Sequence, residues 1–244
     1  MRIIDNHIHC GDNIHKSFTI KDVEQNLREA GADGAVIFAF PEDMYRIEDS
    51  REWRIRANNY VLELSRISEM EIYPFYFVWN DYIIPDNLND YVGIKWHRHW
   101  DEPRYDYDDP RCDEMLKAIK ELNLPVLIEE EYQETVNFVQ DNPELNIIIP
   151  HMGGLNGGCD KMDIFFDNPN IYFDTSTASP DDISRILDNV GADRVIFGSD
   201  VSGTSQPFFN FTKVELEKFM QMDIDHKYRE KILSGNIESL VSKS

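Results

Sequence analysis

The chain has 244 residues, and its 46 acidic side chains outnumber 24 basic ones, giving a formal net charge of −22 at pH 7. Such a surface repels phosphate backbones and anionic lipid, which excludes nucleic acid and membranes as expected partners. The chain lacks both an apolar leader and a run of roughly 20 apolar residues, and its three cysteines form no C-x-x-C pair, so we expect a cytoplasmic protein with reduced thiols.

Short apolar segments recur along the chain and predict β-strands. Several of them are rich in Ile, Val, Phe and Tyr and lack clean alternation, which is typical of parallel strands buried on both faces. The predicted strands cover residues 3–8, 35–40, 72–79, 92–96, 126–128, 146–150, 171–173 and 194–197.

Helical patterns separate these strands. They cover residues 21–30, 50–70, 113–122, 211–222 and 227–233, and a further helix opens at Ser179-Pro180 with a cap and an N1 proline. Eight alternating strand–helix units predict a single (β/α)8 barrel, the TIM barrel, with residues 1–244 as one domain. A doubly wound open sheet is the alternative, but no G-x-G-x-x-G follows the first predicted strand.

Polar side chains gather where the predicted strands end. In a TIM barrel the catalytic residues lie at the C-terminal ends of the strands. In chain order, these ends carry His7, His9, Lys95, His97, Glu129, His151 and Asp200.

The pair His7 and His9 is the sharpest motif. Residues two apart on a strand point to the same side, so both imidazoles can converge on one point. Neutral imidazole suits zinc and similar divalent ions. The alternative for this pair is two histidines hydrogen-bonded in a polar loop.

His151 and Asp200 also follow apolar strands. The glycines after His151 would let the backbone approach a bound group, although a packed core histidine is the alternative. A buried carboxylate needs a partner, so we interpret Asp200 as a metal ligand and proton acceptor. A helix cap or a salt bridge is the alternative for Asp200.

Further motifs extend this pattern from end to end. The pieces are Ile-Asp-Asn-His-Ile-His at 4–9, Gly-Ile-Lys-Trp-His at 93–97, Leu-Pro-Val-Leu-Ile at 124–128, Ile-Pro-His-Met-Gly-Gly at 149–154, Phe-Gly-Ser-Asp at 197–200 and Ile-Leu-Ser-Gly-Asn at 232–236. With these pieces in the family's order, the chain resembles the amidohydrolase superfamily, in its amidohydrolase-2 branch of metal-dependent TIM-barrel enzymes.

The resemblance implies a role for each matching residue. His7 and His9 match the metal ligands of the first strand, and Asp200 matches the aspartate that binds metal and acts as general base. His151 matches a histidine that binds a second metal or orients the attacking water. Lys95 lies near the position of a bridging carboxylated lysine in some relatives. Because this branch usually lacks that bridge, we expect one divalent ion.

Glu129 departs from the family pattern, which places a histidine ligand at the end of the fifth strand. Carboxylate oxygen also binds zinc, so Glu129 is our candidate for a further ligand. It would make the ion a weaker Lewis acid and admit manganese beside zinc. If the strand register differs, Glu130 or Glu131 faces inward instead. The alternative is that residues 129–131 merely form a charged helix start and the metal is lost.

Lys95 and His97 would face the same side and hold a substrate carboxylate or carbonyl. A structural Lys95–Glu129 pair is the alternative. The aromatic and acidic loop 101–110 is a candidate lid, with an ordinary solvated loop as the alternative. We assign no role to Cys10, His15 or His226.

These residues predict a metal-dependent hydrolase that acts on a small-molecule ester, lactone or amide. Asp200 would accept the proton of a metal-activated water, and His151 would orient the hydroxide or stabilise the oxyanion. A non-oxidative decarboxylase, an isomerase and a non-catalytic barrel remain alternatives. The sequence leaves the substrate and a homo-oligomer open.

Overall fold

The computed structural model describes residues 1–12, 17–40, 50–98, 102–202 and 209–242. Eight parallel strands form one sheet, in the order β1-β4-β5-β6-β7-β8-β9-β10. Their bounds are β1 Ile4–His9, β4 Gly34–Phe38, β5 Glu71–Val78, β6 Gly93–His97, β7 Val126–Glu129, β8 Ile147–Ile149, β9 Ile171–Asp174 and β10 Val195–Ile196. All eight predicted strands are therefore present, each close to its expected position.

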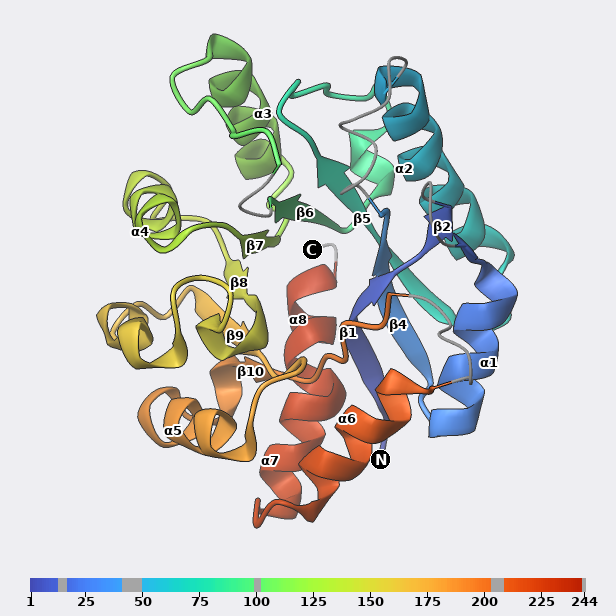
Figure 1. Cartoon of the computed structure of the whole chain (residues 1–244), viewed down its shortest axis with the longest axis vertical. Helices are drawn as coiled ribbons and strands as arrows, with labels where there is room; N and C mark the ends of the chain where they lie inside the picture. The colour runs from blue at the N-terminus through green and yellow to red at the C-terminus, as the bar shows by residue number, and fades with distance from the viewer. Residues whose placement is uncertain (13–16, 41–49, 99–101, 203–208, 243–244) are drawn as a thin grey trace.

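Backbone hydrogen bonds close this sheet into a barrel. The Asn6 amide donates to the Phe197 carbonyl at 3.0 Å, and the His9 amide donates to the Val201 carbonyl at 2.9 Å. Because β1 is thus paired with the segment after β10, the first and last strands are neighbours (Figure 1). The predicted TIM barrel is confirmed.

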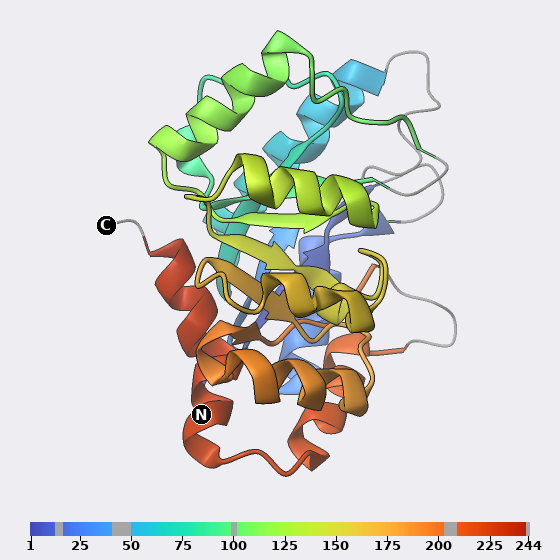
Figure 2. The same ribbon diagram turned by 90° about the vertical axis from the view of Figure 1, so that its left-hand side faces the viewer.

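Helices surround the barrel (Figures 1 and 2). They are α1 Ile20–Ala30, α2 Ser50–Ile67, α3 Pro110–Glu121, α4 Tyr132–Asp141, α5 Pro180–Val190, α6 Phe211–Gln221, α7 His226–Glu230 and α8 Asn236–Val241. In Figure 2, α3 (green), α4 (yellow-green) and α5 (orange) form an outer layer over the strands. The predicted helices occur where expected, and α5 begins after the Ser179 cap with Pro180 at its first position.

Shorter elements complete the described chain. They are the β2 Gly11–Asp12 and β3 Ser17–Phe18 pair, the 3-10 segments Leu88–Asp90, Pro150–Gly153, Cys159–Phe165 and Ala192–Arg194, and the π-helix Lys231–Gly235. The π-helix joins α7 to α8 and leaves the Ile232 carbonyl to accept a hydrogen bond from the Phe197 amide at 2.9 Å. This contact ties the end of β10 to the C-terminal helices.

Helix α8 packs into the barrel interior at the N-terminal end of the strands. Its Ile237 and Val241 belong to one buried cluster with Ile4 and Phe75, among other inward-facing strand residues. This cluster fills the N-terminal half of the barrel interior with apolar side chains. Chemistry is therefore confined to the opposite end.

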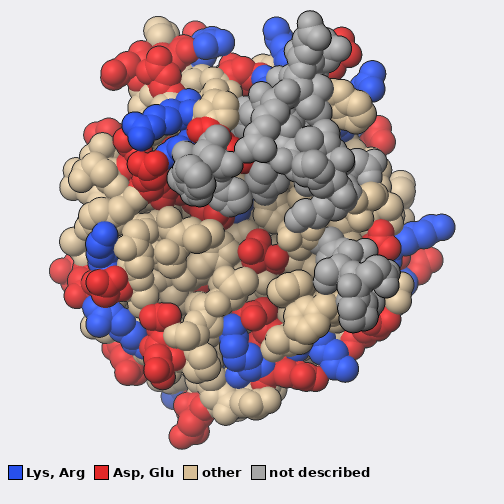
Figure 3. Space-filling model, in the orientation of Figure 1, with Lys and Arg blue, Asp and Glu red and all other residues tan. Residues whose placement is uncertain are grey.

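No described helix is long and apolar enough to span a membrane. Acidic side chains are spread over the face shown in Figure 3, with Lys and Arg side chains between them. The three cysteines are free and buried thiols.

Candidate metal centre

His7, His9 and Asp200 bring three ligand atoms together at the C-terminal end of the barrel, and we call them the first group. Asp200 Oδ1 lies 3.4 Å from His7 Nε2 and 3.7 Å from His9 Nε2. A tetrahedral ion about 2.1 Å from each ligand atom would separate two of them by about 3.4 Å. The donor atoms and their spacing therefore fit a divalent ion.

The histidines are anchored so that their Nε2 atoms face this region. His7 Nδ1 donates to Asp174 Oδ2 at 2.9 Å, and His9 Nδ1 donates to the Ala39 carbonyl at 3.1 Å. A partner on Nδ1 fixes both the tautomer and the ring orientation of a metal-binding histidine. Burial, reinforced by Lys95, lowers the pKa of His7 and holds that of His9 well below its ordinary value. Both imidazoles are thus neutral, as metal binding requires.

His7, Glu129 and His151 form a second, overlapping group of ligand atoms. Glu129 Oε2 lies 3.5 Å from His151 Nε2 and 3.4 Å from Lys95 Nζ, while its Oε1 lies 3.2 Å from His97 Nε2. This arrangement resolves the register of β7: Glu129 faces the barrel interior. Lys95 and His97 face the same side, as expected, but both are directed at Glu129.

Electrostatics make Glu129 the anion of this second group. Burial favours its neutral form, but His97, Lys95 and His151 together hold its pKa well below the ordinary range. Burial likewise opposes the charge on His151, yet its hydrogen bond to Glu129 raises the pKa of that imidazole to about 9. The buried carboxylate is therefore surrounded by the side-chain nitrogens of Lys95, His97 and His151, which offset the cost of burying its charge.

Asp174, at the end of β9, is a site residue that the sequence analysis missed. It is fully buried and accepts hydrogen bonds from His7 Nδ1, from the His151 amide at 3.0 Å and from the Ser176 amide at 3.0 Å. Its position after Ile-Tyr-Phe, at the end of a predicted strand, was the signal available in the sequence. Asp174 thus connects His7, which belongs to both groups, with His151 of the second group.

The backbone of His151 is in the left-handed region, with φ of 57°, and Met152 follows with φ of 51°. Residues other than glycine adopt this conformation only where surrounding contacts impose it. The amide bond to Asp174 and the contact of His151 Nδ1 with the Ser176 carbonyl at 3.0 Å provide these contacts. Gly153 packs against Met162, so the described structure gives it a packing role beside the one we expected.

Asp200 is also left-handed, with φ of 61°. The residue before it, Ser199, is held by Asp5, which accepts hydrogen bonds from the Ser199 amide at 2.9 Å and hydroxyl at 2.5 Å. Thr212 Oγ1 donates to the same carboxylate at 2.7 Å. Gly198 allows this segment to pass close to His7, because a Cβ there would lie 3.1 Å from the His7 Cβ. These contacts aim Asp200 at the two imidazoles.

Arg98 and the loop after β6 support the neighbouring strand ends. Arg98 is buried between Glu130, at 3.2 Å, and Glu131, at 2.8 Å. In the candidate lid, Tyr105 is buried and donates to the Val78 carbonyl at 2.5 Å, while Tyr107 stacks on Trp96. Through Tyr105 and Tyr107, the described part of this loop contacts β5 and β6. Asp101, the first residue of the candidate lid, lies outside the described residues, as does His15.

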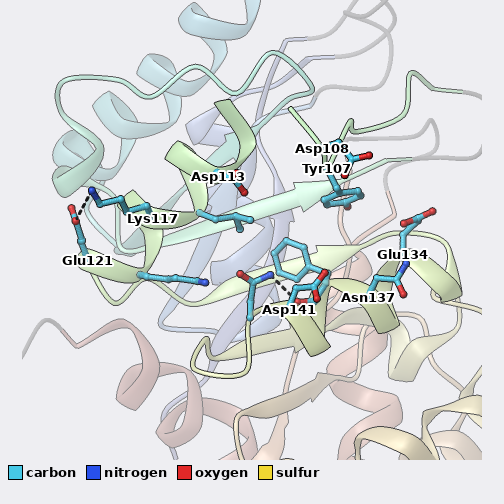
Figure 4. A pocket seen from close by; sticks show the side chains of 12 residues that line it. Tyr107, Asp108, Asp113, Lys117, Glu121, Glu134, Asn137 and Asp141 are labelled. Carbon is cyan, nitrogen blue, oxygen red and sulfur yellow. Dashed lines mark hydrogen bonds and ion pairs between the residues drawn. The ribbon is translucent and has the colours of Figure 1, made fainter. Parts of the chain in front are cut away.

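A groove of about 680 Å³ lies between α3 and α4, outside the barrel (Figure 4). Lys117 and Glu121 form an ion pair at 3.8 Å along one wall, and Asp141 and Phe138 lie on the facing helix. None of the strand-end residues of the two groups lines it. The groove is therefore separate from the candidate metal centre.

Comparison with known families identifies the family of this chain. A sequence profile described as amidohydrolase matches residues 89–242. The chain belongs to the amidohydrolase family. This amidohydrolase is thus an enzyme, and the matched stretch contains Lys95, His97, Glu129, His151 and Asp200, whereas His7 and His9 precede it. No curated protein matches the amidohydrolase in sequence.

Solved structures share the fold of this amidohydrolase at low identity. The probable 2-pyrone-4,6-dicarboxylic acid hydrolase of Acinetobacter baumannii, with citric acid bound, is 16% identical, with 99% of each chain covered and a TM-score of 0.74. The 2,6-dihydroxybenzoate decarboxylase from Rhizobium is 16% identical, with 99% of each chain covered and a TM-score of 0.71. The 5-carboxyvanillate decarboxylase of Sphingomonas paucimobilis is 10% identical, covers 100% of this chain and 99% of its own, and has a TM-score of 0.72.

Proposed function

We propose that this amidohydrolase, as one domain over residues 1–244, hydrolyses a small-molecule ester, lactone or amide with one divalent ion held by His7, His9 and Asp200. The observation that carries the proposal is the convergence of these three ligand atoms at the catalytic end of the barrel. Three protein ligands with further positions open to water and substrate are typical of catalytic zinc sites. Zinc is our first choice, and manganese is the alternative because the set includes a carboxylate.

The ion, when bound, would lower the pKa of a water molecule and polarise the substrate carbonyl. Asp200 supports this chemistry because its side chain is 30% exposed while His7 is fully buried. A carboxylate that reaches solvent can accept the proton of the attacking water and return it to the leaving group. We therefore assign Asp200 the roles of ligand and general base.

We assign His151 the role of stabilising the developing oxyanion. Its Nδ1 is held by Ser176, and its Nε2 faces Glu129. A fixed N–H donor of this kind stabilises the charge that a tetrahedral intermediate carries. Lys95 and His97, which we expected to hold substrate, would instead position Glu129.

Glu129 and His151 were expected as additional ligands of the same ion. In the described structure they group with His7 but not with His9 and Asp200. We therefore propose that both lie beside the ion, with Glu129 as an acceptor for the attacking water or the substrate. The Lys95–Glu129 ion pair, our alternative to substrate binding by Lys95 and His97, is present, and the intact first group supports catalysis.

Non-oxidative decarboxylation is the second candidate function. The similar folds of the two decarboxylases favour it over isomerisation. The three free cysteines support a cytoplasmic location for either enzyme.

The test combines metal content with product analysis. Elemental analysis of the untagged parent, of Asp200→Asn and of the exposed control Asp223→Asn should give about one ion in the parent and control and a marked loss in Asp200→Asn. The parent is then assayed on lactones, esters, amides and aromatic carboxylates. A new acid without carbon dioxide supports the hydrolase, and carbon dioxide release supports the lyase. A parent that binds neither zinc nor manganese contradicts both.

A further inference from the structure

Lys95 is not one of the ligand residues of the second group, but its side-chain nitrogen lies against two of them, His7 and Glu129. Its side chain is fully buried, and its Nζ donates to His7 Nε2 at 3.1 Å and to Glu129 Oε2 at 3.4 Å. The ammonium also lies 4.6 Å from the centre of the Phe38 ring, a cation–π contact. Three different strands, β1, β4 and β6, therefore contribute to the position of one buried cation, and β7 contributes its carboxylate.

These contacts hold the Lys95 ammonium where an ion bound by the second group would otherwise lie. Like charges a few ångströms apart repel strongly in a buried site, where water does not screen them. His7 Nε2 has one lone pair, so it can serve either Lys95 or an ion of the first group. When an ion takes that lone pair, Lys95 keeps its contacts with Glu129 and Phe38.

Glu129 is the single carboxylate of the second group. Its one negative charge is already shared among Lys95, His97 and His151. A divalent ion at Glu129 and His151 would therefore add two positive charges beside a carboxylate that Lys95, His97 and His151 already contact. A carboxylated Lys95 is disfavoured for the opposite reason, because its negative group would lie against Glu129.

We propose that Lys95 acts as an internal cation in place of a second metal ion, and so limits this enzyme to one ion in the first group. The proposal rests on the proposed function, because it concerns the same metal centre. Removing the ammonium should release Glu129 and His151 to bind a second ion. Lys95 is thus a positioning residue that determines the number of ions bound.

The test replaces Lys95 by Met, which is similar in length and uncharged, and by Arg, which keeps the charge. Each protein is equilibrated with excess manganese and desalted, and its manganese content is measured by elemental analysis. Electron paramagnetic resonance then reports whether two manganese ions are coupled. We expect about one equivalent in the parent and in Lys95→Arg, and about two coupled equivalents in Lys95→Met.

The double variant Lys95→Met/Glu129→Gln locates the second ion and should return the content to about one equivalent. Circular dichroism verifies folding, and Lys95→Gln replaces Lys95→Met if the latter does not fold. One equivalent in the parent and still one in both neutral variants overturns this inference but leaves the proposed function intact. Two equivalents in the parent also overturn it.

A parent without any ion overturns the proposed function instead. In that case, uptake of an ion by Lys95→Met would still support the exclusion of ions by Lys95. If Lys95→Met also took up no ion, the inference would fall together with the proposed function.

Discussion

Asp174 accepts a hydrogen bond from His7 Nδ1 at 2.9 Å, and the side chains of both residues are fully buried. The same carboxylate receives the His151 amide at 3.0 Å. One carboxylate at the end of β9 therefore sets the orientation of two histidines in the candidate metal centre. This contact fixes the His7 tautomer that leaves Nε2 available to an ion.

We predict that Asp174→Asn weakens zinc binding by about 10–100-fold, the usual cost of losing a carboxylate behind a ligand histidine. The substitution preserves the shape of the side chain but removes its charge. Competition with a chelator of known affinity measures the change. The control is Asp163→Asn, whose carboxylate is 60% exposed and pairs with Arg185. Equal affinities in Asp174→Asn and the parent would contradict the role of Asp174.

We predict that Tyr105→Phe destabilises the fold by about 1–3 kcal/mol, because it leaves buried carbonyl groups without their donor. The hydroxyl of Tyr105 contacts the carbonyls of Val78 and His97, which lie on β5 and β6. Urea unfolding measures the free energy. Tyr228→Phe, at a residue that is 40% exposed, is the matched control and should change stability by less than about 0.5 kcal/mol. Equal midpoints for the two variants would show that the loop contact is dispensable.

We predict that Ile237→Ala costs about 2–5 kcal/mol, because it opens a cavity among closely packed side chains. Ile237 is fully buried and belongs to the cluster that fills the N-terminal half of the barrel. The control is Ile67→Ala, at a residue that is 69% exposed. Thermal or urea unfolding compares them. A loss for Ile237→Ala no larger than that for Ile67→Ala would mean that α8 does not stabilise the barrel.

We predict that the folded protein is inert to a thiol reagent such as dithionitrobenzoate at pH 8. Burial raises the pKa of the Cys112 thiol to about 12 and that of Cys159 to about 11. The reactive thiolate is therefore scarce near pH 8, and its fraction grows as the pH rises toward these values. In guanidinium all three cysteines should react, as absorbance will show. Rapid reaction of the native protein at pH 8 would contradict the burial of these thiols.

Local patterns were sufficient to predict most of the elements. Ser179-Pro180 predicts the start of α5, and the structure confirms that cap. The predicted helical ranges did not cover α4, although a helix start at residues 129–131 was one alternative for the glutamates there. Glutamate is not one of the favoured N-cap residues, so the sequence gives no clear start signal for this helix.

The candidate site likewise combines features that the sequence predicts with features that only the structure shows. Spacing on one strand already indicates that His7 and His9 lie on one side, because this relation is local. The sequence left Glu129, Glu130 and Glu131 as alternatives, and the structure directs Glu129 inward and Glu130 to Arg98. A shift of one residue reverses the face of a strand, so the pairing of β7 with β6 was needed to decide this.

By itself, the sequence determined the alternation of strands and helices and the residue types at the strand ends, since both follow from neighbouring residues. Only the tertiary structure decided that Asp174 holds His7, that Lys95 lies against Glu129, and that the five expected ligands divide into two overlapping groups. His7 and Asp174 are 167 positions apart. Contacts at such separations depend on how the closed barrel aligns its strands, and no pattern of neighbouring residues encodes that alignment.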